Sequence, residues 1–545
     1  MYDTLAAVVV LSLLSHAYFK RNEPQPFQFL GYLAFGSTLS FAGLVGIHKA
    51  TIFQALLSTI LYASLYLAVL STSIIAYRLS PWHPLAAFPG PKLAVISKWW
   101  MVYNVLGKGG RHLTLQKLHN NLGPFVRVGP NELSINHASA VRSVYKLDRA
   151  VFYQATPSKG DAVITVLDRQ RHATRRQAWA RAVTGEAMYS YIPPTQRRIK
   201  QFLEIIQQQT SAGKKVILDH WLSLFFMDLM GDMGFSGGFE TMKAGEDKDG
   251  WIDILGKGVM FTAAMGQLPW LKTIMMLLPQ RGPIESFQNF THDKILEIQK
   301  SPKKDMRQDI LSTVMDHRPG STPLTLDEAA ADSALIVVAA TDTGIQTALS
   351  FVRYICVDQE KQRRLQKEID EVFDQTGELD VKAVMHLPYF DACIQESLRI
   401  MPPGPFGPPK TTGETGARIL DTWIPPSTTV HVPVFALHRD PANFGPLADT
   451  FIPERWLESE ITSTLDKQKL LPCNREAFVP FSTGYSSCIG KQLAQQNLKI
   501  FLAYLFHAYE ILPSSDFNAK EFDASYKEYG LWTHDPFKVK FIPRQ

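Results

Sequence analysis

Cysteine is scarce in this chain, and several common motifs are missing. Four cysteines in 545 residues are too few for a disulfide framework and indicate a reducing compartment. No C-x-x-C or H-E-x-x-H pattern is present, which argues against zinc. No G-x-G-x-x-G follows an expected strand and no Walker loop occurs, so nothing in the chain predicts a flavin or nicotinamide domain.

The chain also lacks a strong excess of charge of one sign. The chain has 56 basic and 51 acidic residues, a net charge of +5, and no run of five like charges. Such a diffuse excess argues against nucleic acid as a partner.

Long apolar runs, by contrast, fill residues 1–79. The runs Phe27–Ile47 and Ile52–Tyr77 are long enough to cross about 30 Å of hydrocarbon as helices, whereas Leu5–Phe19 is marginal. The alternative for that first run is a cleaved signal peptide, but its basic pair, Lys20–Arg21, follows the apolar residues instead of preceding them. Residues 1–79 are therefore predicted to form a membrane anchor of two or three transmembrane helices. With three spans, the positive-inside rule puts Lys20–Arg21 and everything after Arg78 in the cytosol.

The rest of the chain divides into a hinge, residues 80–115, and a folded body, residues 116–545. The hinge opens with "SPWHPLAAFPGPKL", whose four prolines make a stiff irregular connector. Two short strands are expected within 124–136 and more within 402–453. A capping box at Thr325–Glu328 opens a helix to about Cys356 that is apolar almost all round, so we expect it to be covered on every side. The fold class is mostly α with small β-sheets.

The strongest chemical signal is the segment "FVPFSTGYSSCIGKQLA", residues 478–494. Phe481, Gly484, Cys488 and Gly490 form the pattern F-x-x-G-x-x-x-C-x-G just before an expected helix. A helix start directs N–H groups and a positive dipole end at the sulfur, which favours the thiolate. The glycines allow positive φ and the close approach of a flat ligand. The pattern suits a single axial thiolate ligand to haem iron, and the alternative is a small buried core cysteine.

A buried acid beside an alcohol is the second signal. Asp342 and Thr343 lie midway along the apolar helix, where a carboxylate is costly unless it has a role. Thr343 can hydrogen-bond to a small bound ligand, Asp342 can relay protons, and the flanking Ala339, Ala340 and Gly344 leave room for a local bulge. Pairing of Asp342 with a neighbouring base is an equal alternative.

A third motif, "ESLR", places Glu396 and Arg399 at i and i+3 on one helix. Alone, such a pair is more often a solvated surface salt bridge. Arg455, in "FIPERW", can join it in a buried network.

Together these motifs resemble the cytochrome P450 superfamily of haem-thiolate monooxygenases over about residues 81–545. The resemblance implies that Cys488 is the proximal ligand of haem b and that Asp342 and Thr343 serve oxygen activation. It implies a structural triad of Glu396, Arg399 and Arg455. "RHATRRQAW" matches the family helix whose residues, here His172 and Arg176, bind a haem propionate, and "LHRDP" (437–441) is also typical of the family. The distal substrate pocket would be lined by Ile336, Ala339, Ala340, Phe406 and Leu531.

Three positions depart from the family pattern. Ser486 stands where an Arg or His usually faces a propionate, so another group is expected to compensate. Ala340 replaces the common Gly, and Gly344 replaces the common second Thr or Ser.

The resemblance also implies partners and a location. Electrons would come from NADPH–cytochrome P450 reductase, with cytochrome b5 as a possible second donor. Lys491 and the Arg175–Arg176 region are candidates for a basic docking face. The location would be the endoplasmic reticulum membrane, with the catalytic domain facing the cytosol. The apolar stretch 259–279 is either a core helix pair broken at Pro269 or a membrane contact.

The sequence thus predicts a membrane-anchored monooxygenase, most like fungal members, acting on a lipophilic terpenoid, steroid, aromatic or other secondary metabolite or xenobiotic. A haem-thiolate isomerase or dehydratase acting without O2 is the first alternative, although Asp342–Thr343 argues against it. A non-enzymatic membrane receptor is the second.

Overall fold

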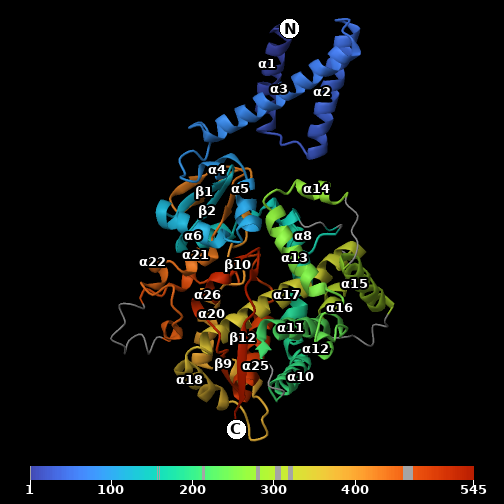
Figure 1. Cartoon of the computed structure of the whole chain (residues 1–545). Helices are drawn as coiled ribbons and strands as arrows, with labels where there is room; N and C mark the ends of the chain where they lie inside the picture. The colour runs from blue at the N-terminus through green and yellow to red at the C-terminus, as the bar shows by residue number, and fades with distance from the viewer. Residues whose placement is uncertain are drawn as a thin grey trace.

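The computed structural model describes residues 2–155, 158, 160–211, 215–277, 283–300, 309–316, 323–457 and 471–544. Three N-terminal helices stand apart from a larger, mainly helical body (Figure 1). They are α1 Tyr2–Phe19, α2 Pro26–Gly46 and α3 Ile52–Leu79. The ends of α1 and α3 nearest the body lie together, since the Lys20 Nζ is 3.9 Å from the centre of the Tyr77 ring.

Length and composition make α2 and α3 long and apolar enough to cross a membrane. The same holds for α17, Leu326–Ile355, but 61% of its most apolar window is buried inside the body, which makes it a core helix. α1 is shorter. Exposed large hydrophobic residues cover all three N-terminal helices, as expected of a membrane anchor.

The body is mostly helical, as the sequence predicts. Its longer helices are α6 Arg111–Leu122, α8 Arg169–Val183, α10 Ile192–Ser211, α11 Leu218–Phe235, α13 Trp251–Met265, α15 Pro283–Lys300, α17, α18 Gln359–Asp370, α20 Pro388–Ile400 and α25 Lys491–Ala508. Its shorter helices are α4 Lys92–Ile96, α5 Trp99–Val102, α7 Val141–Tyr145, α9 Ala187–Ser190, α12 Thr241–Ala244, α14 Leu271–Met275, α16 Ile310–Met315, α19 Val381–Val384, α21 Val434–His438, α22 Pro441–Phe444 and α26 Ala519–Ser525.

Small sheets lie beside these helices. A five-stranded sheet has the order β1-β2-β8-β5-β3, with β2 parallel to β8 and the other pairs antiparallel. A three-stranded sheet has the order β4-β12-β9, and β6-β7 and β10-β11 form two ribbons. The strands are β1 Phe125–Gly129, β2 Glu132–Ile135, β3 Asp148–Arg149, β4 Val216–Ile217, β5 Lys410–Thr411, β6 Ala417–Ile419, β7 Thr422–Ile424, β8 Thr429–His431, β9 Tyr509–Pro513, β10 Lys527–Glu528, β11 Trp532–Thr533 and β12 Lys538–Pro543.

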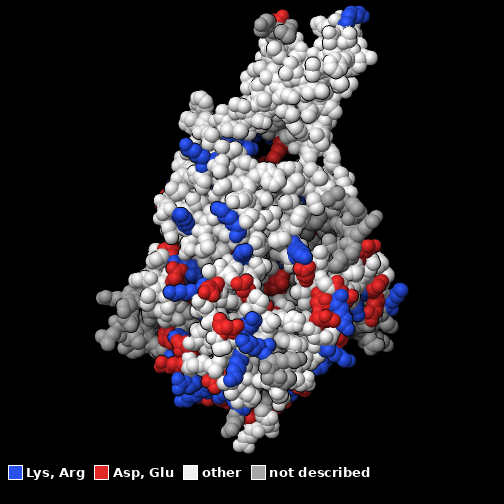
Figure 2. Space-filling model, in the orientation of Figure 1, with Lys and Arg blue, Asp and Glu red and all other residues white. Residues whose placement is uncertain are grey.

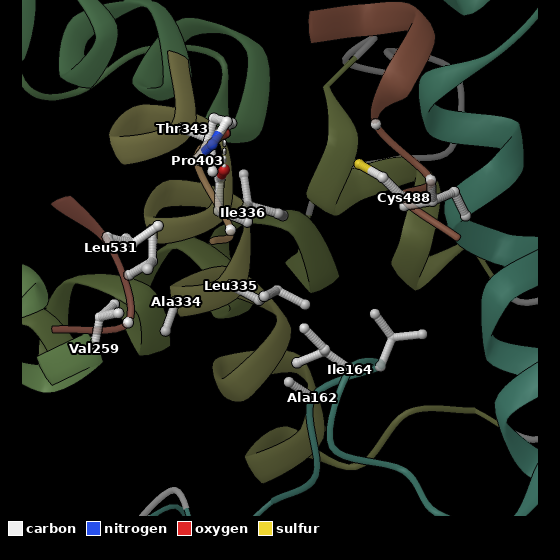
Figure 3. A pocket seen from close by; sticks show the side chains of 18 of the residues that line it. Ala162, Ile164, Val259, Ala334, Leu335, Ile336, Thr343, Pro403, Cys488 and Leu531 are labelled. Carbon is white, nitrogen blue, oxygen red and sulfur yellow. Dashed lines mark hydrogen bonds between the residues drawn. The ribbon is translucent and has the colours of Figure 1, made fainter. Parts of the chain in front are cut away.

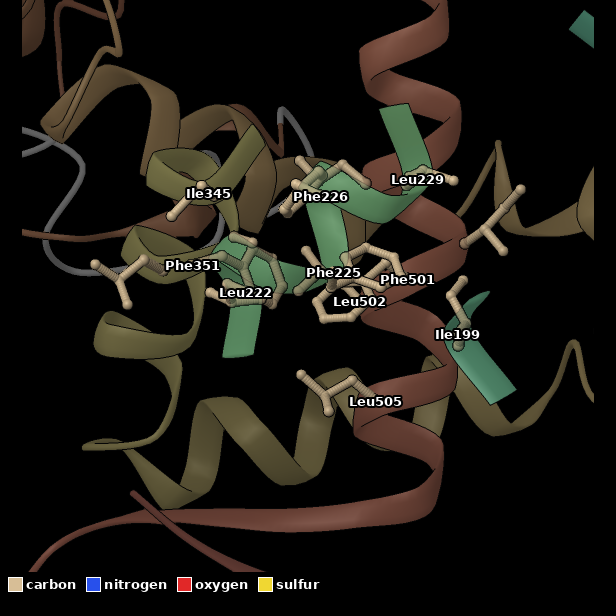
Figure 4. Packing of buried hydrophobic residues seen from close by; sticks show 14 of the residues in the cluster. Ile199, Leu222, Phe225, Phe226, Leu229, Ile345, Phe351, Phe501, Leu502 and Leu505 are labelled. Carbon is tan, nitrogen blue, oxygen red and sulfur yellow. The ribbon is translucent and has the colours of Figure 1, made fainter. Parts of the chain in front are cut away.

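The main core forms where α11, α17 and α25 meet (Figure 4). The rings of Phe225 and Phe501 lie 4.6 Å apart at their centroids, and Phe202 packs edge-on against both. Residues of α11 fill this core along almost its whole length. The expectation that α17 is covered on every side is wrong for part of the helix, because one face of it borders a cavity.

Candidate functional site

A cavity of about 1330 Å³ lies inside the body between α17 and the loop that leads into α25. Figure 3 shows the Cys488 sulfur on one side of it, with Thr343, Ile336 and Leu531 across the space. All five residues predicted to line a substrate pocket do line this cavity: Ile336, Ala339, Ala340, Phe406 and Leu531. Sequence reasoning missed the large share of the wall that α13 contributes, from Ile254 to Ala263.

The loop around Cys488 is held by its own backbone. The Cys488 N–H donates to the Phe481 carbonyl at 2.9 Å. Gly484 has φ +78°, and a Cβ there would lie 2.9 Å from the Tyr145 carbonyl oxygen, so glycine is required. Gly490 differs from expectation, since its φ is −81°. Gly490 lines the cavity and keeps this part of it open, because an added Cβ would project into empty space with no atom within 4 Å.

The thiol of Cys488 faces the cavity, and its exposed surface is the surface that borders this internal space. Burial raises its pKa, while the Gly490 N–H and the cations of Arg176 and Lys491 lower it. The helix start and the two cations therefore favour a thiolate, whereas the apolar surroundings of the sulfur disfavour it. A bound metal cation is the kind of partner that favours the thiolate at such a site.

Basic groups gather beside the sulfur. Arg149, His172 and Arg176 line the cavity, and no Asp or Glu does so among the described residues. The Arg176 Nη1 donates to the Ser487 carbonyl at 2.8 Å, and the Arg149 Nη1 donates to the Val163 carbonyl at 3.0 Å. Burial, together with Arg149, Arg176 and Lys410, lowers the pKa of His172 to about 4. An anionic ligand would relieve this accumulation of positive charge.

Ser486, where the family has a base, lies against Lys410. The Lys410 Nζ donates to the Ser486 Oγ at 2.5 Å, and the lysine is fully buried at the start of β5. Burial and then Arg149 lower the pKa of Lys410 to about 8. Sequence reasoning did not find this lysine, because only the folding of β5 into the sheet brings it next to a loop 76 residues away.

These features fit a haem group. An open, glycine-bordered space adjoins the thiol, and the Nδ1 of buried His172 has no hydrogen-bond partner among the described residues. A thiol on one side, and beside it a group of cations on a cavity wall where no described Asp or Glu is exposed to the cavity, match the iron and the two carboxylates of haem b.

Asp342 and Thr343 are neighbours on α17, but Thr343 lines the cavity and Asp342 does not. The Thr343 Oγ1 lines the cavity and donates to the Ala339 carbonyl at 2.6 Å. Burial raises the pKa of Asp342 to about 6. The expected bulge is absent, since α17 runs as one continuous α-helix from Leu326 to Ile355. Gly344 serves packing, because a Cβ there would lie 2.6 Å from the Phe226 ring on α11.

Glu396, Arg399 and Arg455 form one buried network, not a surface pair. All three side chains are 0% exposed. Glu396 accepts hydrogen bonds from the Arg399 Nε at 2.8 Å and from the Arg455 Nε at 2.9 Å. The Arg399 Nη1 donates to the His438 carbonyl at 2.7 Å, and the Val479 N–H donates to the His438 Nε2 at 3.0 Å. His438, from the "LHRDP" segment, thus links the network to the start of the Cys488 loop.

Arg175 is not on a docking face, contrary to expectation. Its side chain is 7% exposed, and its Nη2 donates to buried Asp332 of α17 at 2.6 Å. Lys491 is exposed. Figure 2 shows an anchor and an adjoining part of the body with few charges, whereas charged side chains cover the opposite end.

Of the stretch 259–279, the structure describes residues 259–277, which have a buried part followed by an exposed apolar part. The stretch contains the end of α13, whose Ala263, Ala264 and Met265 are buried, and then α14, which lies at the end of the body nearest the anchor (Figure 1). Trp270, Ile274 and Leu277 around α14 are exposed, Leu277 by 68%.

Comparison with known proteins agrees with this geometry. The cytochrome P450 family model matches residues 93–541. The chain is 29% identical to cytochrome P450 67 of Uromyces fabae, an alignment that covers 98% of this chain and 99% of that protein. It is 30% identical to the cytochrome P450 monooxygenase AMT3 of Alternaria alternata over 85% of this chain and 94% of that protein. It is 27% identical to the trichothecene C-15 hydroxylase of Fusarium sporotrichioides, with 86% and 95% covered.

Proposed function

The chain belongs to the cytochrome P450 family and is a monooxygenase; we propose that it inserts one oxygen atom from O2 into a large lipophilic molecule, with electrons from a separate NADPH–cytochrome P450 reductase. The observation that carries the proposal is the placement of Cys488 and a cluster of cations on one side of an apolar cavity, with Thr343 across from them. Cytochrome b5 is a second candidate electron donor.

Haem b is the proposed cofactor, and its iron with the thiolate supplies the chemistry that cleaves O–O bonds when it is bound. Cys488 would be the iron ligand, with the Gly490 N–H directed at its sulfur. His172 and Arg176 would hold one propionate. Lys410 would act through Ser486 by donating to its oxygen, which leaves the serine hydroxyl hydrogen free for the other propionate.

Thr343 and Asp342 have proton-handling roles in this proposal. The Thr343 hydroxyl donates to the Ala339 carbonyl, so its oxygen keeps lone pairs that can accept a hydrogen bond from a small molecule bound in the cavity. A carboxyl with a pKa of about 6 can both take up and release a proton near neutral pH.

The substrate is proposed to be lipophilic because most of the residues that line the cavity away from Cys488 are apolar. Ala330, Ala331 and Ala334 of α17 keep the cavity wide, and α13 adds Ile254, Leu255 and other apolar side chains. Terpenoids are favoured by the relative whose name specifies trichothecene hydroxylation. Steroids, aromatics and xenobiotics have the same apolar character.

Location and domain division are also proposals. Residues 1–79 would anchor the protein in the endoplasmic reticulum membrane, residues 80–115 would be the hinge, and residues 116–545 the haem-thiolate catalytic domain in the cytosol. The basic residues Lys20 and Arg78 at the body-side ends of α1 and α3 support this orientation.

The test is expression of the full chain in microsomes together with a reductase. We expect a 450 nm band in the reduced, CO-treated difference spectrum and NADPH-dependent products 16 mass units heavier than terpenoid, steroid or aromatic substrates. Turnover of a hydroperoxide without NADPH would instead support the isomerase or dehydratase alternative. A colourless protein would exclude haem chemistry.

A further inference from the structure

A buried ion pair lies beside the cavity, which Arg111 lines. Arg111, the first residue of α6, donates from Nε to the Glu528 Oε2 at 2.7 Å and from Nη2 to Oε1 at 2.5 Å. The two side chains are 2% and 0% exposed and come from positions 417 residues apart. Neither residue belongs to the proposed haem site or to the motifs that resemble the cytochrome P450 family.

Glu528 fixes the turn that carries Leu531 into the cavity. Its Oε1 accepts the Gly530 N–H at 2.7 Å, and its own N–H donates to the Gly109 carbonyl at 2.7 Å. The turn cannot shift towards α13, because a single added Cβ at Gly530 would already lie 2.8 Å from the Ala263 Cβ. The turn is therefore held between α13 on one side and Arg111 on the other. Figure 3 shows Leu531 and Val259 of α13 together, across the cavity from Cys488.

Arg111 also holds a second cavity wall. Its guanidinium carbon lies 3.9 Å from the centre of the Phe406 ring, a cation–π contact. The Phe406 ring also lies 4.2 Å from the His431 ring and 6.3 Å from the Phe152 ring, between centroids. Arg111, Phe406, Gly530 and Leu531 all line the cavity.

Stability alone does not explain such a pair, because well-packed apolar residues usually stabilise a core as well as a buried ion pair does. What a bidentate pair provides in addition is a fixed direction for both partners. We propose that Arg111 and Glu528 form a latch of positioning residues that sets Leu531 and Phe406, and thereby determines which bulky substrates, and which of their carbons, the cavity presents. This inference rests on the proposed function.

The test compares two probes that ligate haem iron and shift the Soret band. Imidazole is too small to reach Leu531, whereas clotrimazole is bulky enough to extend away from the iron. The variants are Arg111→Met, the double Arg111→Met/Glu528→Met, which leaves no unpaired charge, and Leu531→Ala. The matched control is Arg142→Met, which breaks the exposed Arg142–Glu476 pair.

We expect each latch variant and Leu531→Ala to bind clotrimazole at least tenfold more weakly than the wild type, with imidazole affinity and the 450 nm band unchanged. The control should match the wild type with both probes. The latch is refuted if the double variant binds clotrimazole within twofold of the wild type. It is refuted too if the double variant holds no haem, since the pair is then a folding requirement. Failure of wild-type protein to bind imidazole would instead count against the proposed function.

Discussion

At the scale of single residues, basic side chains gather on the side of the cavity near Cys488, where haem is proposed to bind. Lys410 is fully buried and donates to Ser486, the position at which the family usually supplies a base. The charge of the Lys410 ammonium helps to lower the pKa of His172, as do the charges of Arg149 and Arg176. Since no Asp or Glu among the described residues lines the cavity, these basic groups favour an anion on this side, and this can be tested one residue at a time.

Replacing Lys410 by Met should speed haem loss about tenfold, because a charge-assisted hydrogen bond contributes about 1.5–3 kcal/mol. The measurement is haem transfer to apomyoglobin, followed in the Soret region. Adding Ser486→Arg to Lys410→Met should restore retention, whereas Lys215→Met, a change at an exposed surface pair, should have no effect. Unchanged retention in Lys410→Met would remove this lysine from the haem site.

Replacing Thr343 by Ala should uncouple NADPH oxidation from product formation about tenfold, since it removes the hydroxyl that lines the cavity. Thr343→Ser keeps the hydroxyl and should stay coupled. The ratio of hydrogen peroxide to product measures the effect, and equal ratios in the two variants would exclude a role for the hydroxyl.

Asp342 should cost stability at neutral pH. Its pKa is raised by burial from 3.8 to about 6, so the folded state holds this proton more tightly than the unfolded chain does. The cost is absent below pH 3.8, grows between pH 3.8 and 6, and is complete above pH 6. Asp342→Asn should therefore stabilise the protein by about 3 kcal/mol at pH 7.5 and by less at pH 5, while lowering coupling. Thermal unfolding at both pH values checks this, and a gain independent of pH would contradict it.

The sequence singles out Cys488, Asp342 and Thr343 as candidates because of a local departure from the usual pattern: a lone cysteine among glycines, or an acid in an apolar helix. No local sequence pattern marks Lys410 or Arg111, and none indicates that Arg175 is buried. Their partners, Ser486, Glu528 and Asp332, are brought near only by tertiary packing, so the pattern around each residue is that of an ordinary surface cation.

At the scale of elements, helices and loops are joined by buried hydrogen bonds. The end of α20 carries Glu396 and Arg399, which bind the 3₁₀ turn Pro453–Trp456 through Arg455 and, through His438, the loop before Cys488. The sequence indicated α17 by its capping box and apolar composition, a helix after Cys488 that is α25, and the two strands β1 and β2. It could not indicate that α17 stays unbulged, since the close contact between Gly344 and Phe226 depends on how α11 packs.

Replacing Glu396 by Ala should leave two buried arginines without their carboxylate and destabilise the body by about 3–5 kcal/mol. We expect loss of the 450 nm band and a species absorbing near 420 nm. Glu476→Ala, which breaks an exposed pair, should change neither the spectrum nor thermal unfolding measurably. Retention of a normal spectrum and melting temperature in Glu396→Ala would contradict the structural role of the network.

At the scale of the whole molecule, the anchor and the body depend on different forces. None of the buried hydrophobic clusters of the body includes a residue before Leu85, so its core is complete without α1, α2 and α3. The two parts meet through a few polar contacts, such as the Arg78 Nη1 donating to the Ile96 carbonyl at 2.6 Å. The body should therefore fold and hold haem when residues 2–79 are removed.

The truncated body should nevertheless remain on membranes, because the exposed Trp270, Ile274 and Leu277 lie around α14 at the end nearest the anchor. Three apolar side chains in the interface each add roughly 1 kcal/mol or more of membrane affinity. Removing residues 2–79 should leave the 450 nm band intact and partial sedimentation with phosphatidylcholine vesicles. Adding Ile274→Asp and Leu277→Asp should abolish that sedimentation without changing the spectrum, whereas Trp423→Asp, at an exposed aromatic on β7, should leave it intact. Full release of the truncated body, before any substitution, would show that α1–α3 alone hold the protein to the bilayer.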